Sequence, residues 1–490
     1  KYMYYFNGAG IGAGDFNNDG KIDLFFASNQ GENKLYLNEG NLHFKDVSKE
    51  AMLPQDGGWS TGVSVVDINN DGLLDIYICR MGDYDSIHSK NQLLVCQGID
   101  KNGVPYYKDE AHQYGLDFSG FSTQAVFFDY DGDGDLDMFL LNHSVFENET
   151  IGNRDMLLKR QVPVSGDRIY RNDGNGHFTD VTKETGINSS VLDFGLGVTV
   201  SDINLDGYPD IYVGNDFHEN DYLYINQHNG TFKDELTNHM MHTSKFTMGV
   251  DVADANNDGY PDIMSMDMLA SDPNILKRSL GDDNQDIFNL KLGLGYYYQY
   301  PRNNLQLNRR NGMFSEIGLY SGVAATDWSW SALWMDFDND GSKDLFVSNG
   351  IPRRLNDIDY INYVSNSEMQ QKLQSESLDK KDIDALNKFP QIKIYNKFFR
   401  NEGNMQFQDI GNEIGNDQTT FSNGAIYADL DNDGDLDIAV NNIDAPALIY
   451  ENKTNDKKDP GKNKDWGERK LNGSSKSINA LGAKIVLYCN

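Results

Sequence analysis

The sequence predicts an all-β protein, a seven-bladed β-propeller with four-stranded blades, from one repeated loop motif and its flanking strands. The nine-residue pattern D-x-[DN]-x-D-G-x-x-D begins at Asp15, Asp67, Asp129, Asp202, Asp254, Asp336 and Asp429. The shortest spacing, from the first start to the second, is 52 residues. That spacing defines the repeated unit, and the longer spacings are the same unit with insertions.

Each unit also carries four short segments with strand character. Six units have an aromatic residue eight positions before the loop: Trp59, Phe121, Phe194, Phe246, Trp328 and Phe421. Such a recurring residue is expected to fill the same gap between blades each time. After the loop come an apolar run such as Ile76–Cys79, an N-x-L-Y-x-N-like signature such as Asn303–Asn308, and an F-x-[DE]-[IV] segment such as Phe314–Ile317. Gly, Asn and Asp turns separate these segments, which favours antiparallel strands.

Four antiparallel strands repeated seven times around an axis predict a propeller, which protects sheet edges by radial repetition. A linear solenoid is the alternative, but its units are usually shorter and single-stranded. We expect the propeller over residues 1–452 and a charged linker over 453–469. The last unit has no F-x-[DE]-[IV] segment after Asn452. We expect the missing outer strand to come from sequence ahead of Lys1.

The repeated loops have the composition of calcium sites. Calcium takes six to eight oxygen ligands from carboxylates, amides and backbone carbonyls. Positions 1, 3, 5 and 9 offer side chains, position 7 offers a carbonyl, and glycine at position 6 permits a sharp turn. The expected ligands are Asp15, Asn17, Asp19, Lys21 and Asp23; Asp67, Asn69, Asp71, Leu73 and Asp75; Asp129, Asp131, Asp133, Asp135 and Asp137; Asp202, Asn204, Asp206, Tyr208 and Asp210; Asp254, Asn256, Asp258, Tyr260 and Asp262; Asp336, Asp338, Asp340, Ser342 and Asp344; and Asp429, Asp431, Asp433, Asp435 and Asp437.

About seven structural Ca²⁺ ions are therefore expected, one per loop. Asparagine at position 3 of four loops lowers the ligand charge, which suits weaker sites and millimolar calcium. Magnesium fits less well because it keeps its waters and demands octahedral geometry. None of the loops brings a nucleophile or a base.

The charge balance excludes two classes of partner. Lys and Arg number 42 against 75 Asp and Glu, for a formal net charge of -33. Nucleic-acid binding needs a basic face, and adsorption to an anionic membrane needs one as well. Bound calcium would relieve much of the self-repulsion that this charge creates.

The cysteines and the chain termini add little. Cys79, Cys96 and Cys489 form neither a disulfide framework nor a zinc spacing. A Cys79–Cys96 bridge between neighbouring strands stays open, although an offset register disfavours it. No run approaches the ~20 apolar residues of a membrane span, and Lys1–Tyr5 lacks signal-peptide architecture.

The acidic loops and their flanking strands resemble FG-GAP/VCBS repeats, the calcium-binding propeller units of integrin α heads. Leu471–Leu487 resembles the start of a small ASPIC/UnbV β-domain, so residues 470–490 are expected to be its truncated beginning. Together these features resemble the cartilage-acidic-protein-like group and its bacterial surface members. The resemblance implies a secreted or surface-anchored protein, an outer-membrane lipoprotein. It does not imply an enzymatic activity.

All the large insertions connect the second and third strands of a unit: Asn142–Gly166, Ser265–Arg302 and Gly350–Tyr395. If strands run from inner to outer, these connections lie on the face opposite the calcium loops, and insertions gathered on one face mark a binding face. The expected partner-binding residues are Tyr296, Tyr297, Tyr298, Tyr300, Arg353, Arg354, Tyr360 and Tyr363. The tyrosines are suited to interfaces, and the alternative that they pack the insertion onto the propeller stays open. The two arginines could meet an anionic ligand or form a solvated pair.

Two functions remain open. The first is a surface binding or scaffold subunit that binds another surface protein, within an outer-membrane uptake or assembly complex. The second is a carbohydrate-binding or polysaccharide-lyase propeller, whose base and aromatics would converge on the channel mouth near Trp328 and Trp330. His239 and His242 form an H-x-x-H without a nearby glutamate, and nucleophile and phosphate-loop motifs are absent from the sequence, so an enzyme is disfavoured.

Overall fold

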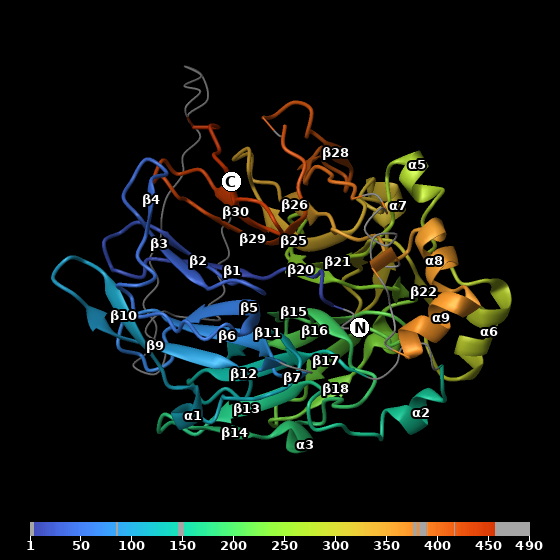
Figure 1. The fold of residues 1–490 in the computed structure, drawn as a ribbon, viewed down its shortest axis with the longest axis horizontal. Coiled ribbons are helices and arrows are strands. Elements are labelled where there is room, and N and C mark those ends of the chain that lie inside the picture. The colour runs from blue at the N-terminus through green and yellow to red at the C-terminus, as the bar shows by residue number, and fades with distance from the viewer. Residues whose placement is uncertain are drawn as a thin grey trace.

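Seven antiparallel sheets surround a central axis in the computed structural model of the chain (Figure 1). The structure describes residues 4–84, 87–145, 151–375, 380–381, 389, 391–415 and 417–455. Six sheets have four strands and the seventh has three. The predicted seven-bladed propeller is therefore confirmed. Within the described residues, which end at 455, the last blade has three strands, and the source of its outer strand remains a prediction.

The strands of each blade follow one another in chain order from the axis outward. Blades one to three comprise β1 (Ile11–Gly14), β2 (Asp23–Phe26), β3 (Lys34–Asn38) and β4 (Phe44–Asp46); β5 (Trp59–Val66), β6 (Asp75–Met81), β9 (Gln92–Ile99) and β10 (Pro105–Asp109); and β11 (Ser122–Phe128), β12 (Asp137–Asn142), β13 (Arg168–Asn172) and β14 (Phe178–Asp180). A small hairpin of β7 (Asp83–Tyr84) and β8 (Ile87–His88) is inserted in blade two.

Blades four to seven repeat this order. They comprise β15 (Gly195–Ser201), β16 (Asp210–Asn215), β17 (Tyr222–Asn226) and β18 (Phe232–Asp234); β20 (Gly249–Ala253), β21 (Asp262–Met266), β23 (Asn304–Asn308) and β24 (Phe314–Glu316); β25 (Ser329–Met335), β26 (Asp344–Asn349), β27 (Lys397–Asn401) and β28 (Phe407–Asp409); and β29 (Ser422–Ala428), β30 (Asp437–Asn442) and β31 (Leu448–Tyr450). A parallel pair, β19 (Thr243–Ser244) and β22 (Gln299–Tyr300), lies beside blade five.

The helices lie in the connections between strands and are not part of the blades. Four single-turn helices follow outer strands: α1 (Ala111–Tyr114), α3 (Thr182–Thr185), α4 (Leu236–His239) and α7 (Gly318–Ser321). Five lie in the insertions: α2 (Arg154–Leu157), α5 (Pro273–Leu276), α6 (Gln285–Gly293), α8 (Ile358–Val364) and α9 (Ser367–Gln374). Because strands alternate in direction, the loops between first and second strands share one face, and the insertions lie on the other.

The first strands form a closed ring around the axis. Each contacts the first strand of the next blade, and β1 contacts both β5 and β29. Side chains of one first strand also bond to the backbone of the next. Thr61 Oγ1 donates to the carbonyl of Ser122 at 2.7 Å, and Ser331 Oγ donates to the carbonyl of Asn423 at 3.1 Å. These bonds fix the spacing between neighbouring blades.

Glycines set how closely the first strands approach. A Cβ on Gly249 would lie 1.6 Å from the carbonyl oxygen of Trp330 in the next blade. A Cβ on Gly62 would lie 2.3 Å from the carbonyl oxygen of Thr123. Both obstacles are backbone atoms of a packed strand, so only glycine fits at these positions.

The hydrophobic core lies between the blades. One cluster, for example, joins Tyr77 and Leu93 of blade two to Leu140 of blade three. The recurring aromatics belong to such contacts: five of the six are buried, and Phe246 packs partly buried in the cluster of Trp328. Their predicted packing role is confirmed.

Cys79 and Cys96 are buried and free, so the bridge left open by the sequence is not formed. The two side chains belong to different core clusters, between blades two and three and between blades one and two. Burial raises the pKa of the Cys79 thiol, and both cysteines act as small apolar groups.

The predicted C-terminal β-domain (470–490) and nearly all of the charged linker lie outside the described residues. None of the helices within the described ranges combines the length and apolar character that a membrane crossing needs.

Gly249→Ala is expected to lower the free energy of unfolding by more than about 3 kcal/mol, because the new methyl group meets a backbone carbonyl. Gly293→Ala is the matched control, since a Cβ at Gly293 would meet nothing within 4 Å. Thermal melting of both variants checks this. Equal melting temperatures would contradict the close approach of the first strands.

Candidate functional site

Each of the seven acidic loops is organised by the carboxylate at its first position. In the first loop, Asp15 Oδ1 accepts the backbone N–H of Asp19 at 2.9 Å, and Oδ2 accepts that of Gly20 at 2.9 Å. The corresponding pair of bonds recurs in every other loop. A carboxylate that accepts two backbone donors fixes the turn around itself.

The carboxylate at position 9 joins the loop to the third strand of its blade. Asp23 Oδ2 accepts the N–H of Phe16 at 3.0 Å, and Oδ1 accepts the N–H of Asn38 at 2.7 Å. All seven blades repeat these two bonds. The seven side chains are also fully or almost fully buried. Position 9 is thus the link between loop and sheet.

Burial raises the pKa of these position-9 carboxyl groups. Desolvation raises the pKa of Asp23, Asp75, Asp210, Asp262 and Asp344 to about 7, although backbone N–H donors oppose the shift. The same cause gives Asp137 a pKa of about 8 and Asp437 a pKa of about 6. A buried carboxylate needs a nearby cation to stay ionised without a large free-energy cost.

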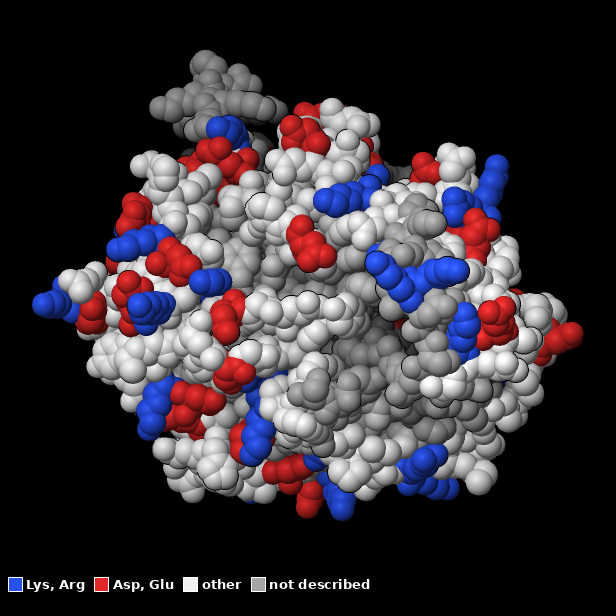
Figure 2. Space-filling model, viewed as in Figure 1, with Lys and Arg blue, Asp and Glu red and all other residues white. Residues whose placement is uncertain are grey.

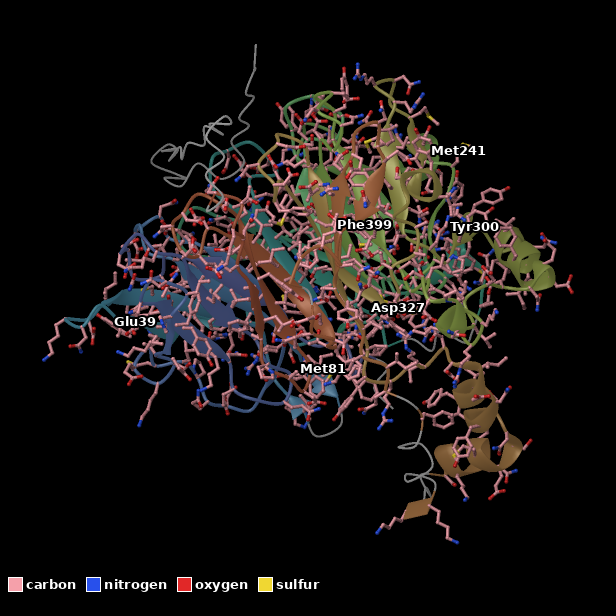
Figure 3. All side chains as sticks on the ribbon, turned by 90° about the horizontal axis from the view of Figure 1, so that it is seen from above. Glu39, Met81, Met241, Tyr300, Asp327 and Phe399 are labelled. Atoms are coloured by element: carbon pink, nitrogen blue, oxygen red, sulfur yellow. The ribbon has the colours of Figure 1, made fainter. Side chains whose placement is uncertain are left out.

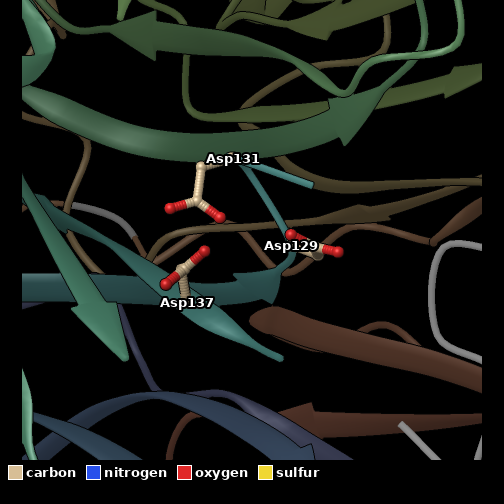
Figure 4. Close-up of side chains that lie close together, drawn as sticks. All are labelled: Asp129, Asp131 and Asp137. Carbon is tan, nitrogen blue, oxygen red and sulfur yellow. The ribbon is translucent and has the colours of Figure 1, made fainter. Parts of the chain in front are cut away.

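Three loops bring carboxylates together at positions 1, 3 and 9. The groups are Asp129, Asp131 and Asp137; Asp336, Asp338 and Asp344; and Asp429, Asp431 and Asp437. Within each group, one oxygen from every residue lies within 4.8 Å of the others (Figure 4). Three negative charges this close repel one another, and an all-oxygen donor set is the kind that hard divalent cations prefer. These residues fit a metal ion.

The remaining predicted ligands play other parts here. Each position-5 carboxylate accepts the backbone N–H of position 7, as Asp133 does from Asp135 at 3.0 Å, so it holds the turn. The position-3 asparagine accepts the N–H of position 5 in the other four loops, as in Asn17 with Asp19 at 3.1 Å. Coordination by positions 5 and 7 remains a prediction.

Sequence reasoning missed the fourth position of the loop. It has a left-handed backbone in all seven loops: Asn18, Asn70, Gly132, Leu205, Asn257, Asn339 and Asn432. Four of these asparagines, Asn18, Asn257, Asn339 and Asn432, also bond to the next loop. Asn18 Nδ2 donates to the carbonyl of Gly72 at 3.2 Å, and Asn257 Nδ2 donates to the carbonyl of Gly341 at 2.8 Å. The repeated Asn or Gly at position 4 was the signal available in the sequence.

The last asparagine of the N-x-L-Y-x-N signature connects neighbouring blades. Asn401 Nδ2 donates to the carbonyl of Lys343 in its own loop and to that of Ala255 in the preceding loop, both at 3.0 Å. Asn38 makes the same connection from blade one to Leu430 of blade seven, at 2.6 Å. The loops are therefore joined to one another around the ring.

Comparison with known proteins agrees with this repeated geometry. The FG-GAP-like repeat matches residues 15–78, 152–213, 202–265, 280–347 and 394–440, more than half of the chain. The chain belongs to the FG-GAP-like repeat family. This confirms the resemblance that the acidic loops indicated.

The chain is also similar to cartilage acidic protein 1 from three animals. The human protein is 28% identical over 203 residues, which cover 39% of this chain and 29% of the human protein. The mouse protein is 29% identical over 139 residues, covering 27% of this chain and 20% of the relative. The Xenopus tropicalis protein is 26% identical over 140 residues, covering 28% and 21%. The matched region thus spans less than a third of each relative.

The predicted partner-binding tyrosines of blade five divide into two groups. Tyr296 is buried, and Tyr297 donates its hydroxyl to the carbonyl of Met240 at 2.9 Å and packs against the core. Tyr298 is 44% exposed. Tyr300 is half-buried between His242 and Phe288. Packing onto the propeller, the alternative left open, therefore holds for Tyr296 and Tyr297.

The blade-six residues also differ from expectation. Arg354 is buried in an ion pair with buried Asp327, at 2.7 Å, so it is neither solvated nor free for a ligand. Arg353 donates to the carbonyl of Phe389 at 3.4 Å. Tyr360 and Tyr363 pack their rings against Phe389 as well.

His239 and His242 point to different partners. His239 bonds to Glu235 and to the carbonyl of Gly312. His242 lies 3.8 Å from Glu316, and burial lowers its pKa. Each histidine has its own glutamate, contrary to the sequence reading, but the pair is not among the metal-ligand groups found in the described residues.

Asn401→Ala is expected to lower the free energy of unfolding by about 2 kcal/mol, because it leaves two loop carbonyls without a donor. Asn289→Ala on the exposed side of α6 is the control, expected to change it by less than about 0.5 kcal/mol. Denaturant unfolding of both variants measures the difference. A loss no larger than the control's would contradict the linking role of the asparagine.

Proposed function

We propose that this chain is a calcium-stabilised extracellular binding module, held together by an ion in each loop, that docks another protein on its insertion face. The carboxylates at positions 1, 3, 5 and 9, with asparagine at position 3 of four loops, would hold the ions. Calcium is favoured over magnesium because the donors are all oxygens and are numerous enough for a large, flexible shell. When bound, it supplies the positive charge that the buried carboxylates need.

The loop bonds give calcium a structural rather than catalytic part. Position 9 joins each loop to its own third strand, and the signature asparagine joins it to the neighbouring blade. Binding in a loop therefore stabilises two blades at once. An ion that binds only the folded ring adds stability by mass action.

The observation that carries the docking proposal is the platform, defined as the insertions of blades three, five and six. Arg278, just after α5, pairs with Asp357 at 2.9 Å and with Asp359 at 3.2 Å, just before and within α8. Backbone bonds run both ways between these insertions, from Leu280 to Asn356 and from Ile358 to Arg278, each at 2.8 Å. The insertions of blades five and six therefore form one continuous surface.

The blade-three insertion joins the same surface. The N–H of Arg154, at the start of α2, donates to the carbonyl of Leu294 at 2.9 Å. Its guanidinium pairs with fully buried Glu219. The helices of the platform gather at one side of the ring (Figure 1), and α8 and α9 project from it when the molecule is seen from above (Figure 3).

The platform carries apolar side chains in contact with water. They are Met156, Leu276, Leu280, Leu290, Tyr298 and Ile358, with exposed fractions from 38% to 73%. Charged side chains of both signs are scattered over the face in view in Figure 2. Exposed apolar side chains that lie among polar ones are typical of protein interfaces.

The proposal extends to a location and a partner. The relatives are named cartilage acidic protein 1, and cartilage is an extracellular tissue. We place this chain outside the cell, as a lipoprotein-type subunit of an outer-membrane uptake or assembly complex whose partner is another surface protein. We assign no catalytic activity, because the carboxylates of the loops are committed to cation binding.

A second candidate, carbohydrate binding, is favoured by the central cavity of about 400 Å³, which Tyr4, Trp59, His143 and Trp330 line. All four side chains are buried, however. Burial also lowers the pKa of His143 to about 4, so the imidazole is neutral. A sugar would have to displace the packed ring of Tyr4, which lies 4.4 Å from that of His143.

Calcium removal is expected to lower the melting temperature by more than about 5 °C, because seven sites lose their neutralising charge. Melting is compared in millimolar calcium, in millimolar magnesium and in chelator. Equal melting temperatures in calcium and chelator would contradict the structural role of calcium, and full protection by magnesium would contradict the choice of ion.

Leu290→Ser with Tyr298→Ser is expected to weaken partner capture at least tenfold, since exposed apolar anchors dominate interface energies. The control is Leu319→Ser with Tyr320→Ser, two side chains of similar character on α7, outside the platform. Proteins captured from native membranes in calcium are identified by mass spectrometry. Equal loss in both pairs, or none in either, would contradict the platform, and a captured glycan would favour the second candidate.

A further inference from the structure

One turn near the calcium loops differs between blades. In each blade, one residue of the third strand or just after it donates its N–H to the position-9 carboxylate. Two residues further along the chain, four blades have a glycine with a left-handed backbone: Gly40, Gly98, Gly174 and Gly403. In blade five the same position is Arg310, with φ 59°. An arginine pays a conformational cost there that glycine does not. The placement of its side chain is therefore of interest.

The Arg310 guanidinium lies on the loop of its own blade. Its Nε donates to Asp258 Oδ2 at 3.0 Å, and its Nη2 lies 2.9 Å from the same oxygen. The guanidinium also lies over the ring of Tyr260, 5.7 Å from the centroid. Asp258 is the position-5 carboxylate, and its Oδ1 accepts the N–H of Tyr260 at 2.9 Å. Both oxygens of this carboxylate thus already have donors, one of them cationic.

Loop two provides a matched comparison. It has the same ligand types, with Asp71 at position 5, and Gly98 at the equivalent turn. Asp71 accepts bonds from Asn69 and from the N–H of Leu73. Over the ranges that the structure describes, the ion pairs include none to Asp71 from a basic side chain. The two loops therefore differ chiefly in Arg310.

Two other loops hold a basic side chain at position 5. Lys21 lies 2.9 Å from Asp19; it belongs to the loop itself, and its flexible stem can swing into solvent. His228 has the turn position of Arg310 in blade four, lies 2.8 Å from Asp206 and stacks on the ring of Tyr208 with the centroids 4.0 Å apart. A histidine carries charge only when it is protonated, whereas an arginine is always charged and offers a planar fork of donors, so the effect should be largest in loop five.

We propose that Arg310 competes with calcium for Asp258 and makes loop five the weakest of the seven sites. The inference rests on the proposed function, in which the loops bind calcium. A divalent ion in loop five must displace the guanidinium or accept its repulsion. Breaking a partly exposed ion pair of this kind reduces affinity about twofold to fivefold.

Loop five belongs to blade five and contacts blade six, and these two blades carry the longest insertions. Asn401 of blade six donates to Ala255 of this loop, so an empty loop five loosens the contact between blades five and six. As the calcium concentration falls, loop five therefore empties before the other loops, and the contact between blades five and six, which carry the platform, loosens before the contacts between other blades. Arg310 sets the concentration at which that occurs.

The test measures calcium binding to the full chain by titration calorimetry, with Ca²⁺ as the only ligand added. The wild-type protein is expected to show a weak site besides the tighter ones. Arg310→Asn, which removes the charge and tolerates the left-handed backbone, is expected to tighten that site about twofold to fivefold. Arg309→Asn is the matched control, since it removes a charge from the same turn, whereas the ion pair with Asp258 belongs to Arg310.

Two further variants locate the site and guard against misfolding. Asp254→Ala should abolish the weak site, whereas Asp67→Ala in loop two should remove a tight one. Arg310→Gly, the residue of four other blades, repeats the main test without strain. An unchanged weak site in both Arg310 variants, or equal tightening in Arg309→Asn, overturns the inference. A complete lack of calcium binding in the wild-type chain instead overturns the proposed function.

Discussion

Seven aspartates, one at the ninth position of each loop, lie inside the protein with both carboxylate oxygens bonded to backbone N–H groups. One of those donors belongs to the loop and the other to the third strand. The bonds give the loop its shape, but they do not replace the water that a charged group loses on burial. The fold therefore contains buried negative charge that a proton or a cation must compensate. This requirement applies to all seven loops on the face of the propeller where they lie.

The same loops connect the blades to one another. Asn401 joins its loop to the preceding one, and Asn257 bonds forward to Gly341 of the next. At the axis, Gly249 lets its strand approach the backbone of Trp330. Blades are thus joined by polar contacts on one face, apolar clusters between the sheets and close backbone packing at the centre. The opposite face is left free for the insertions.

The sequence predicted the repeat, the strand order and the face on which each connection lies, because these follow from spacing and local turn chemistry. It also placed the convergent carboxylates of Asp129, Asp131 and Asp137. It did not predict the burial of Tyr296 or the pairing of Arg354 with Asp327. Those contacts join segments far apart in the chain, and a tyrosine or arginine in an insertion has the same local pattern whether it faces solvent or the ring.

Position 4 of the loop and the glycines of the first strands were missed for a different reason. Both signals are present in the sequence, but their meaning depends on a neighbouring blade. Asn18 is ordinary in a turn until Gly72 lies beside it, and Gly62 is ordinary in a strand until Thr123 approaches. A single unit read alone does not contain this information.

The ring also has a seam. Six pairs of neighbouring blades are joined by the chain itself, whereas blades seven and one contain its two described ends and meet through strand contact and asparagine side chains. Asn441 alone donates to three carbonyls of blade one, at 3.0 to 3.1 Å, and Asn432 reaches Gly20. Ile11 and Leu24 of blade one also pack with Leu430 and Ala439 of blade seven. At this seam, therefore, amide side chains and a small apolar cluster fasten two blades that the described chain does not connect directly.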